Sequence, residues 1–371
     1  MSKFKISFTL KQHTPLIHFQ ANQSGATLRA TELKPKFDKF LLEKNPNLPK
    51  KTNSNGYYSL EYKVKIEPNI SQSEVIAGRN PLFFGNMGDG DDKEFKTHNK
   101  EFEIEFFSFK SEIIEAIKEN FEAFLANTNF GTRQSKGFGS FYITDKSFNK
   151  NLIPYKVYSF NSNNWQKDVG LLYQFLRQGI NLSKRPRSPF YTKPAIFSYA
   201  KLKGWQWDKK TIKQHFFNQA LEQQIEEHHL DVVEYSSNTK YLLKDLFGLS
   251  NLEKWKSYYV TIEKEGKSKE TINGKEVTKI QRFKSPITFK IVENVVYFWV
   301  DDSYQTILNE TFTIKNQNQS FDLPTPQNFN FNEFLDFAVN INLNSHIQGK
   351  FHNTNEYRNL KRILNNIKAS L

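Results

Sequence analysis

Residues 102–144 have the sequence FEIEFFSFKSEIIEAIKENFEAFLANTNFGTRQSKGFGSFYIT, and this stretch decides the fold. Apolar and polar residues alternate over residues 102–109, which predicts a half-buried strand. After Ser111, apolar residues recur at spacings of three and four, so we expect an amphipathic helix capped by Ser111. A glycine-rich loop at residues 131–139 then leads into a short strand at residues 140–144.

Three further elements precede this stretch. Residues 3–10 and 58–66 alternate like strands, and residues 31–43 carry apolar side chains at helical spacing. The resulting order is strand, helix, strand, strand, helix, strand, which is the split βαβ plan of ferredoxin-like domains and also underlies the RRM fold. We therefore assign residues 1–150 to an N-terminal ferredoxin-like domain that contains the glycine-rich loop.

The second half, residues 151–371, predicts a more decorated domain of the same class. Its expected strands are residues 155–160, 255–263 and 287–300, and its expected helices are residues 165–182, 331–339 and 355–369. Insertions near residues 205–252 and 264–280 interrupt the pattern, and Asn273-Gly274 predicts a turn between two strands. The predicted fold class is α+β, with tandem ferredoxin-like domains of which the second carries insertions.

The composition narrows the classes of function. The 371 residues include 52 Lys and Arg against 39 Asp and Glu, which predicts a polyanionic partner unless the excess only solubilises the surface. The absence of cysteine excludes disulfides, thiol catalysis and thiolate metal sites, and suits a reducing compartment. The charged start does not resemble a signal peptide, and no apolar run reaches the ~18 residues of a membrane span. We expect a cytoplasmic protein without a membrane partner.

The glycine-rich loop is the most specific local pattern. Gly131, Gly137 and Gly139 would let the backbone approach a ligand closely and expose N–H groups. Arg133 and Lys136 would supply positive charge for phosphates. The loop lacks the Gly-Lys-Ser/Thr ending of a Walker loop. The alternative is that the glycines only turn the chain from helix to strand.

The loop also resembles the RNP1 element of RRM domains, in which aromatic rings stack on bases. That element precedes the second helix of an RRM, whereas the loop with Phe138 follows the predicted second helix here. We therefore expect this loop to grip an RNA backbone rather than to stack bases.

A second pattern is the basic and aromatic stretch of residues 169–207, which holds seven Lys or Arg and no Asp or Glu. Its interleaved residues are the cations Lys184, Arg185, Arg187, Lys193, Lys201 and Lys203 and the rings Phe190, Tyr191, Phe197, Tyr199, Trp205 and Trp207. Cations that neutralise phosphate beside rings that stack bases are what single-stranded RNA binding requires. The alternative is a solvated loop with core aromatics.

A third pattern lies at the start of the first predicted helix. Arg29, Lys34 and Lys36 surround the N-terminus of this helix, where free N–H groups and the helix dipole favour an anion. The alternative is exposed charge that only solubilises the surface.

For catalysis or metal binding the sequence offers little. His13 and His18 flank the end of the first strand and could act as general acid or base in an RNase, although single histidines are more often structural. The segment 226–229 lacks the HExxH spacing, and the acidic loop at residues 89–92 lacks a Glu at EF-hand spacing. We expect no catalytic residue, no metal and no cofactor.

These motifs together resemble the RAMP superfamily of CRISPR-associated proteins. The landmarks are Thr14-Pro15-Leu16, residues 28–36, Leu82-Phe83-Phe84-Gly85 and residues 130–140, with a weaker second set at Arg187-Ser188-Pro189, Leu246-Phe247-Gly248 and residues 282–286. Within the superfamily, the chain is most similar to subunit one of the type III Cmr effector complex, a two-domain RAMP protein. Another RAMP subunit of the same complex is the alternative within the family.

The resemblance implies a non-catalytic RNA-binding subunit in antiviral defence. Such a subunit would hold the 3′ portion of the crRNA or capture target RNA beside other RAMP subunits, and Arg282 joins the candidate RNA contacts. A different class remains open, a metal-independent guide-RNA-processing endoribonuclease with His13 or His18 as acid or base. That family carries its glycine-rich loop near the C-terminus, whereas more than 230 residues follow Gly139 here. A standalone RNA-binding module is the third possibility.

Overall fold

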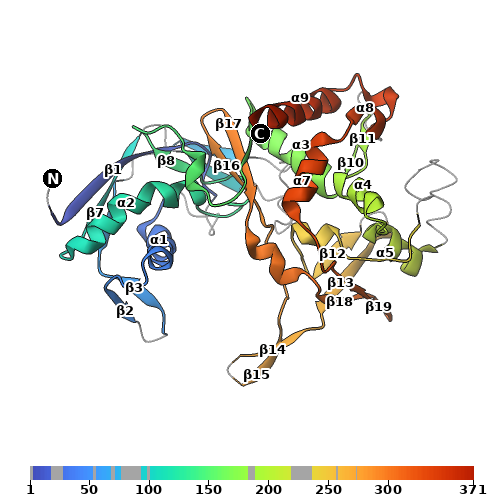
Figure 1. Cartoon of the computed structure of the whole chain (residues 1–371), viewed down its shortest axis with the longest axis horizontal. Coiled ribbons are helices and arrows are strands. Elements are labelled where there is room, and N and C mark those ends of the chain that lie inside the picture. Colours follow the sequence, from blue (N-terminus) through green and yellow to red (C-terminus); the bar gives the residue numbers. More distant parts are fainter. Residues whose placement is uncertain are drawn as a thin grey trace. The chain divides into compact units, whose positions relative to one another are not determined.

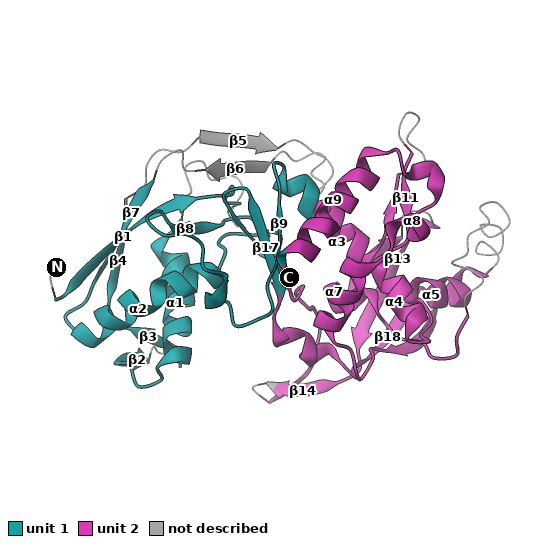
Figure 2. Cartoon of the chain, turned by 45° about the horizontal axis from the view of Figure 1, so that its top comes forward, with its two compact units in different colours: residues 1–169, 288–299, 370 teal, residues 170–287, 300–369, 371 magenta. Residues whose placement is uncertain are grey.

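The computed structural model describes residues 3–17, 28–52, 56–67, 72–76, 93–97, 101–182, 189–218, 236–255, 258–272 and 274–371. The chain forms two compact units of mixed α and β structure (Figure 2). Unit 1 comprises residues 1–169, 288–299 and 370, and unit 2 comprises residues 170–287, 300–369 and 371. Within the described ranges, no helix is long and apolar enough to cross a membrane.

Unit 1 is built on a four-stranded antiparallel sheet with two helices (Figure 1). The strands are β1 (Lys5–Gln12), β4 (Lys63–Ile66), β7 (Phe102–Phe107) and β8 (Phe141–Ile143), in the spatial order β4-β7-β1-β8. The helices are α1 (Ala30–Lys44) and α2 (Ser111–Asn127). The predicted sequence of strand, helix, strand, strand, helix, strand is thus present in unit 1.

Aromatic rings hold the helices of unit 1 to its sheet. Phe37 of α1 is fully buried, and its ring centroid lies 4.7 Å from that of Phe124 and 5.3 Å from that of Phe121, both on α2. The ring of Phe106 on β7 lies 5.9 Å from that of Phe37. Such aromatic contacts add specific geometry to the hydrophobic burial of a core.

Two local predictions in unit 1 need correction. The N-cap of α2 is Lys110 rather than Ser111, and the backbone N–H of Lys110 donates to Oγ of Ser108 at 3.1 Å. The strand predicted at residues 58–66 is divided into β3 (Tyr58–Leu60), which pairs with β2 (Lys50–Thr52), and β4, which pairs with β7. A further pair joins β5 (Gln72–Ile76) to β6 (Lys93–Thr97).

A second sheet of unit 1 is assembled from segments far apart in the chain. Its strands are β16 (Ile287–Val292), β17 (Val295–Val300) and β9 (Tyr158–Asn161), in the order β16-β17-β9. Residues 287–300 were expected to form sheet, and they form two strands, because the chain turns at Glu293, which has a φ of +51°. This β16–β17 hairpin brings residues 288–299 back to unit 1. The boundary expected at residue 150 stays a prediction.

Unit 2 contains an antiparallel sheet in the order β12-β13-β18-β19. The strands are β12 (Leu252–Trp255), β13 (Val260–Gly266), β18 (Thr311–Asn316) and β19 (Gln319–Pro324). This order does not confirm the split βαβ plan expected for the second half. The hairpin of β14 (Lys269–Ile272) and β15 (Lys275–Thr278) forms where Asn273-Gly274 predicted a turn.

Helices supply the rest of unit 2 in the described ranges. They are α4 (Ala195–Leu202), α5 (Asp208–Phe216), α7 (Phe331–Asn340), α8 (Leu343–His346) and α9 (Asn355–Ser370), together with most of α3 (Trp165–Arg177). Short 3-10 turns occur at η2 (Lys244–Phe247), η4 (Asp302–Ile307) and η5 (Gly349–Phe351), with η1 (Lys150–Leu152) in unit 1. A small sheet pairs β10 (Ile180–Asn181) with β11 (Tyr191–Thr192).

Candidate nucleic-acid interface

The glycine-rich loop between α2 and β8 is braced by the chain that follows β1. The backbone N–H of Thr132 donates to the carbonyl of Ile17 at 2.8 Å. The hydroxyl of Thr14 donates to the carbonyl of Gly137 at 2.7 Å and accepts the N–H of Ser140 at 2.9 Å. The loop is therefore a fixed platform whose conformation is set before any ligand arrives.

The three glycine N–H groups of the loop are already used inside unit 1. Gly131 donates to Oε1 of Glu32 at 2.7 Å, Gly137 to the carbonyl of Gln134 at 3.0 Å, and Gly139 to the carbonyl of Pro15 at 2.9 Å. The expectation that these groups are exposed for phosphates is therefore wrong.

The glycines are required for steric reasons instead. Gly131 and Gly139 have φ values of +77° and +69°, a region that favours glycine. A Cβ at Gly131 would lie 2.4 Å from the carbonyl oxygen of Ile17, and one at Gly139 would lie 2.0 Å from that of Phe130. The turn alternative thus explains why glycine occupies these positions.

Strand β16 supports the loop from another side. Lys290 is fully buried, and its Nζ donates to the carbonyls of Thr128 at 2.8 Å and Phe141 at 3.0 Å. Burial lowers the pKa of Lys290 well below its ordinary value. Oγ of Ser140 donates to the carbonyl of Ile291 at 2.6 Å. Lys290 was not among the residues predicted from the sequence. Its position as the single lysine in a largely apolar strand could have indicated a buried, hydrogen-bonded side chain.

The N-terminus of α1 meets the loop, so two patterns far apart in the sequence form one site. Oε1 of Glu32 accepts both the N–H of Gly131 at 2.7 Å and Nζ of Lys36 at 2.8 Å. Lys36 also donates to the carbonyl of Asn129 at 3.3 Å, and its Nζ lies 5.0 Å from the ring centroid of Phe130. The loop and the helix start therefore share one hydrogen-bonded group.

The other predicted cations of α1 differ in their surroundings. Lys34 is directed away from the loop, because its Nζ donates to Oδ2 of Asp38 at 2.7 Å and to the carbonyl of Leu60 at 2.8 Å. Its Nζ also lies 4.1 Å from the ring centroid of Tyr62. Arg29 is the half-buried N-cap residue of α1.

Within the loop itself, the charged Nζ atom of Lys136 is buried, and so is the aromatic ring of Phe138. Arg133 and Lys136 are both half-buried, and burial lowers the pKa of Arg133 below its ordinary value. Phe138 is fully buried, and its ring centroid lies 4.9 Å from that of Trp165. The ring therefore belongs to the core, and the charged end of Lys136 is covered as well.

The basic and aromatic stretch of residues 169–207 is folded rather than open. Its rings at Phe190, Phe197, Tyr199 and Trp207 are each at most 5% exposed, so they pack in unit 2 instead of stacking on bases. This outcome matches the alternative of core aromatics.

The cations of this stretch differ in their surroundings, and Lys201 is exposed. Arg177 and Lys203 make internal contacts, to the carbonyl of Gly248 at 2.9 Å and to Oε1 of Glu333 at 2.6 Å. Lys193 is half-buried, with Nζ 5.4 Å from the ring centroid of Phe197. Lys184, Arg185 and Arg187 lie outside the described residues. Arg282, which the family resemblance added from further along the chain, is exposed.

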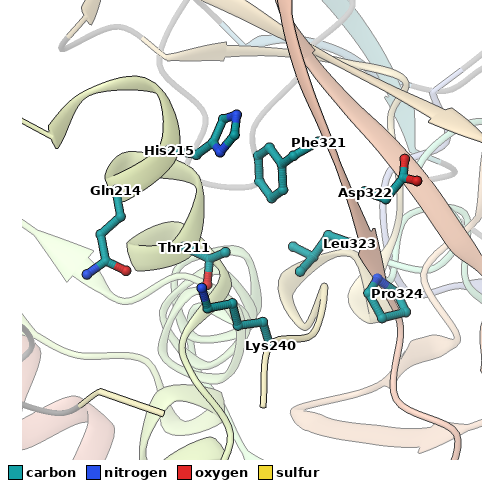
Figure 3. A pocket seen from close by; sticks show the side chains of 8 residues that line it. All are labelled: Thr211, Gln214, His215, Lys240, Phe321, Asp322, Leu323 and Pro324. Carbon is teal, nitrogen blue, oxygen red and sulfur yellow. The ribbon is translucent and has the colours of Figure 1, made fainter. Parts of the chain in front are cut away.

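Unit 2 also has a cavity of about 390 Å³ that the sequence analysis did not anticipate (Figure 3). Its walls come from α5, from β19 and from Lys240, and the ring centroids of His215 and Phe321 lie 4.3 Å apart on one side. None of the residues predicted to bind RNA lines this cavity.

His13 lies beside the loop in a setting that suits a structural role. Its Nδ1 accepts the backbone N–H of Glu293 at 3.1 Å, and burial lowers the pKa of His13 to about 4. A histidine with this pKa is almost entirely neutral near pH 7, so only a very small fraction of it is protonated and able to act as a general acid. In the part of the chain that the structure describes, no group of three or more His, Asp or Glu could hold a metal ion.

Several positions weighed in the sequence lie outside the described residues. They are His18, the family landmark at residues 82–85, the acidic loop at residues 89–92 and the segment 226–229.

Comparison with known proteins identifies the family. The model for the Cmr1 N-terminal domain matches residues 3–181, and the model for the Cmr1 C-terminal domain matches residues 191–369. A search of curated proteins finds no match. The two domain models cover nearly the whole chain and confirm the predicted resemblance. The chain therefore belongs to the Cmr1 family of type III CRISPR effector subunits.

Proposed function

We propose that this chain is a non-catalytic RNA-binding subunit of a cytoplasmic type III effector complex, which holds the 3′ portion of the crRNA or captures target RNA. The observation that carries this proposal is the convergence of the glycine-rich loop and the start of α1 through Glu32. Arg29, Arg133 and Lys136 belong to this braced site. Other RAMP subunits of the complex would be its protein partners.

We also propose that unit 1 is a ferredoxin-like RAMP domain. Its element order and its strand order β4-β7-β1-β8 support this assignment. The exposed sheet face does not resemble the base-stacking face of an RRM, because Ser7 pairs with Glu105 and Thr9 with Glu103 across β1 and β7. These positions carry polar and charged side chains instead of the stacking rings of an RRM, and Glu105 is paired with Lys5, which favours binding at the loop over base stacking on the sheet.

The contact with RNA would be made by side chains and would depend on salt. Because the glycine N–H groups donate inside unit 1, phosphates would be neutralised by Arg133 and Lys136 instead. Each neutralised phosphate releases counterions, so affinity falls as the salt concentration rises.

The competing assignment, a metal-independent endoribonuclease, has less support. Of the two candidate acid–base residues, the structure describes only His13. Its pKa is lowered to about 4, and its Nδ1 accepts a backbone hydrogen bond. The position of the loop, with β16 and β17 of the same unit far downstream, also differs from that family.

The test is a titration of single-stranded RNA with the full chain over a range of salt concentrations. The variant Arg133→Ala with Lys136→Ala should bind more weakly, and the slope of log affinity against log salt should fall by about 1.4, since two single-strand phosphate contacts are lost. Lys39→Ala with Lys118→Ala removes the same net charge from exposed positions of α1 and α2 and is the matched control. The RNA should be recovered uncut.

Three outcomes would contradict parts of the proposal. If the loop variant binds RNA like the parent, the loop is only a turn and the RNA contact lies elsewhere. If the parent does not bind RNA under any salt condition, the RNA-binding role is wrong. Specific cutting that is lost in His13→Ala would favour the endoribonuclease.

A further inference from the structure

The C-terminal helix α9 has two faces of different chemistry. Its buried face packs into unit 2 through Tyr357, Leu360, Ile363, Leu364 and Ile367. The other side carries the basic stripe, which we define as Arg358, Lys361, Arg362 and Lys368. At 3.6 residues per turn these four positions fall within an arc of about 120° and span about 15 Å of the helix axis. The positive charge is therefore concentrated on one narrow face.

Three cations of the basic stripe, Arg358, Lys361 and Lys368, are not paired in the way that the cations of α1 are. On α1, Lys34, Lys36 and Lys39 each pair with a carboxylate one turn away. No Asp or Glu follows Glu356 in the chain. Across the described residues, the ion pairs include none of Arg358, Lys361 and Lys368.

Helix stability does not account for the stripe. The helix dipole favours cations in the last turn, where Lys368 lies, but not in the first half of the helix, where Arg358 and Lys361 lie. Arg358 is oriented by a hydrogen bond from Nη2 to Oδ1 of Asn355 at 2.7 Å. These two cations therefore need another explanation.

The chemistry of this face fits a nucleic-acid backbone better than a protein. Asn359 and Asn365 accompany the cations and offer further donors, whereas the large apolar residues of the helix lie on its buried face. Protein interfaces have an apolar centre that excludes water. Interfaces with nucleic acid are more polar and far more positive.

Part of the predicted RNA-binding stretch, residues 190–193, contacts the elements just before α9 in the same unit. The ring of Phe190 lies 6.1 Å from that of Phe351 on η5, and Nε2 of His346 on α8 lies 3.0 Å from the carbonyl oxygen of Lys193. Both views draw β11, α8 and α9 as neighbours (Figures 1 and 2). Residues 190–193 therefore pack against η5 and α8, the elements that precede α9 in the chain.

We propose that the basic stripe of α9 binds the sugar-phosphate backbone of single-stranded RNA as a second contact site, in unit 2. The identity of the ligand rests on the proposed RNA-binding function. The site is independent of the loop, since the two belong to different units. It would add sequence-independent affinity through charge.

The test uses the full chain with Arg358→Gln, Lys361→Gln and Lys368→Gln combined. Glutamine keeps a long polar side chain and a good helix propensity, so the melting temperature should not change. RNA affinity at moderate salt should fall at least about tenfold, and the slope of log affinity against log salt should drop by about two. The control removes three exposed charges elsewhere in unit 2, by Lys254→Gln, Lys269→Gln and Lys275→Gln, and should keep the parent slope.

The outcomes separate this inference from the proposed function. If the stripe and control variants weaken binding equally, only net charge matters and the stripe is not a site. If the stripe variant binds RNA like the parent while the loop variant binds more weakly, the proposed RNA site on the stripe is wrong and the proposed site at the loop is supported. A stripe variant that binds RNA normally but no longer assembles with the other subunits would show a protein contact and overturn the RNA assignment. A parent that binds no RNA overturns both.

Discussion

Gly139 is constrained by one atom, the carbonyl oxygen of Phe130. A Cβ at residue 139 would lie 2.0 Å from that oxygen, and the backbone pair between Asn129 and Ser140 leaves little room for it to move. Gly56, also in unit 1, has a similar φ of +79° but meets nothing within 4 Å. The two glycines therefore separate the cost of an unfavourable φ from the cost of a clash.

We predict that Gly139→Ala destabilises unit 1 more than Gly56→Ala does. Both variants lose about 1 kcal/mol in the free energy of unfolding, because each places an L residue in the left-handed region. Gly139→Ala must also displace backbone, so its total loss in the free energy of unfolding should exceed about 2 kcal/mol. Urea denaturation of both variants measures the difference. Equal midpoints would show that the loop can relax around the methyl group.

At the scale of single residues, the sequence predicted which residues form the loop better than it predicted what their N–H groups and side chains do. The three glycines of the loop were identified, but the expected role of their N–H groups was wrong. Two of the acceptors, Glu32 and Pro15, lie 99 and 124 residues away in sequence from Gly131 and Gly139. Phe138 was expected in the RNA site and is fully buried. Long-range packing decides such roles, and no local pattern encodes it.

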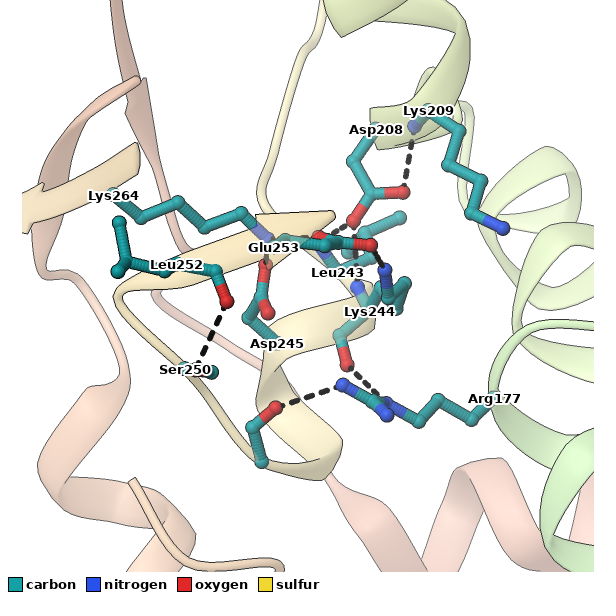
Figure 4. A network of polar contacts seen from close by, with 11 residues as sticks. Arg177, Asp208, Lys209, Leu243, Lys244, Asp245, Ser250, Leu252, Glu253 and Lys264 are labelled. Atoms are coloured by element: carbon teal, nitrogen blue, oxygen red, sulfur yellow. Dashed lines mark hydrogen bonds and ion pairs between the residues drawn. The ribbon is translucent and has the colours of Figure 1, made fainter. Parts of the chain in front are cut away.

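At the scale of elements, unit 2 depends on a buried group of charges that ties α5 and η2 to β12 and β13 (Figure 4). Nζ of Lys264 lies 2.5 Å from Oδ2 of Asp245 and 2.8 Å from Oε2 of Glu253, and Glu253 also pairs with Lys244. Burial lowers the pKa of Lys264, but the two carboxylates outweigh it and hold this pKa above its ordinary value. Oδ2 of Asp208 accepts the N–H of Lys244 at 2.7 Å.

We predict that Lys264→Met lowers the free energy of unfolding of unit 2 by about 3–5 kcal/mol, because it leaves two buried carboxylates with one cation fewer. Lys267→Met is the control, since Lys267 pairs with Asp322 at 2.6 Å in an exposed position and should cost less than about 1 kcal/mol. Adding Asp245→Asn to Lys264→Met should recover part of the loss. Similar unfolding curves for the two single variants would contradict a supporting role for the buried group.

Helices whose apolar residues recur at a clear helical period could be predicted from the sequence, and helices without such a period could not. α1, α2, α7 and α9 occur where apolar spacing placed them. In contrast, α4 was missed because its lysine and aromatic rings were assigned to an RNA-binding stretch, and α5 was missed because it falls in the region near residues 205–252 that was treated as an insertion. The rings of α4 and its neighbours are core residues, which becomes visible only when the strands and helices around them are known.

At the scale of the whole molecule, the chain does not divide into two consecutive halves. Residues 288–299 belong to unit 1, although the surrounding chain belongs to unit 2. The matched family domains are continuous in sequence, with the first ending at residue 181. A prediction from the sequence alone could not place this segment, since both its strands are apolar enough to fit either unit.

This arrangement makes the N-terminal half dependent on β16. Asn129 and Ser140 donate to the carbonyls of Phe289 and Ile291, at 2.8 and 2.6 Å, and Lys290 donates to two carbonyls at the ends of the loop. Each lost hydrogen bond costs about 1 kcal/mol, and losing the burial of Phe289 and of Ile291 against unit 1 would each cost about 1.5–3 kcal/mol more. Together these losses approach the whole stability of a typical domain.

We therefore predict that a fragment of residues 1–181 does not fold cooperatively by itself. Its buried donors at Asn129 and Ser140 would lose their partners, and the apolar surface that β16 covers would be open to water. Circular dichroism and thermal melting should show a broad transition, and co-expression with residues 182–371 should restore a sharp one. Lys290→Met in the full chain removes only the ammonium group that donates to the carbonyls of Thr128 and Phe141. This variant should melt at a lower temperature than the parent and still fold. A fragment that melts as sharply as the full chain would show that unit 1 does not need the β16–β17 hairpin.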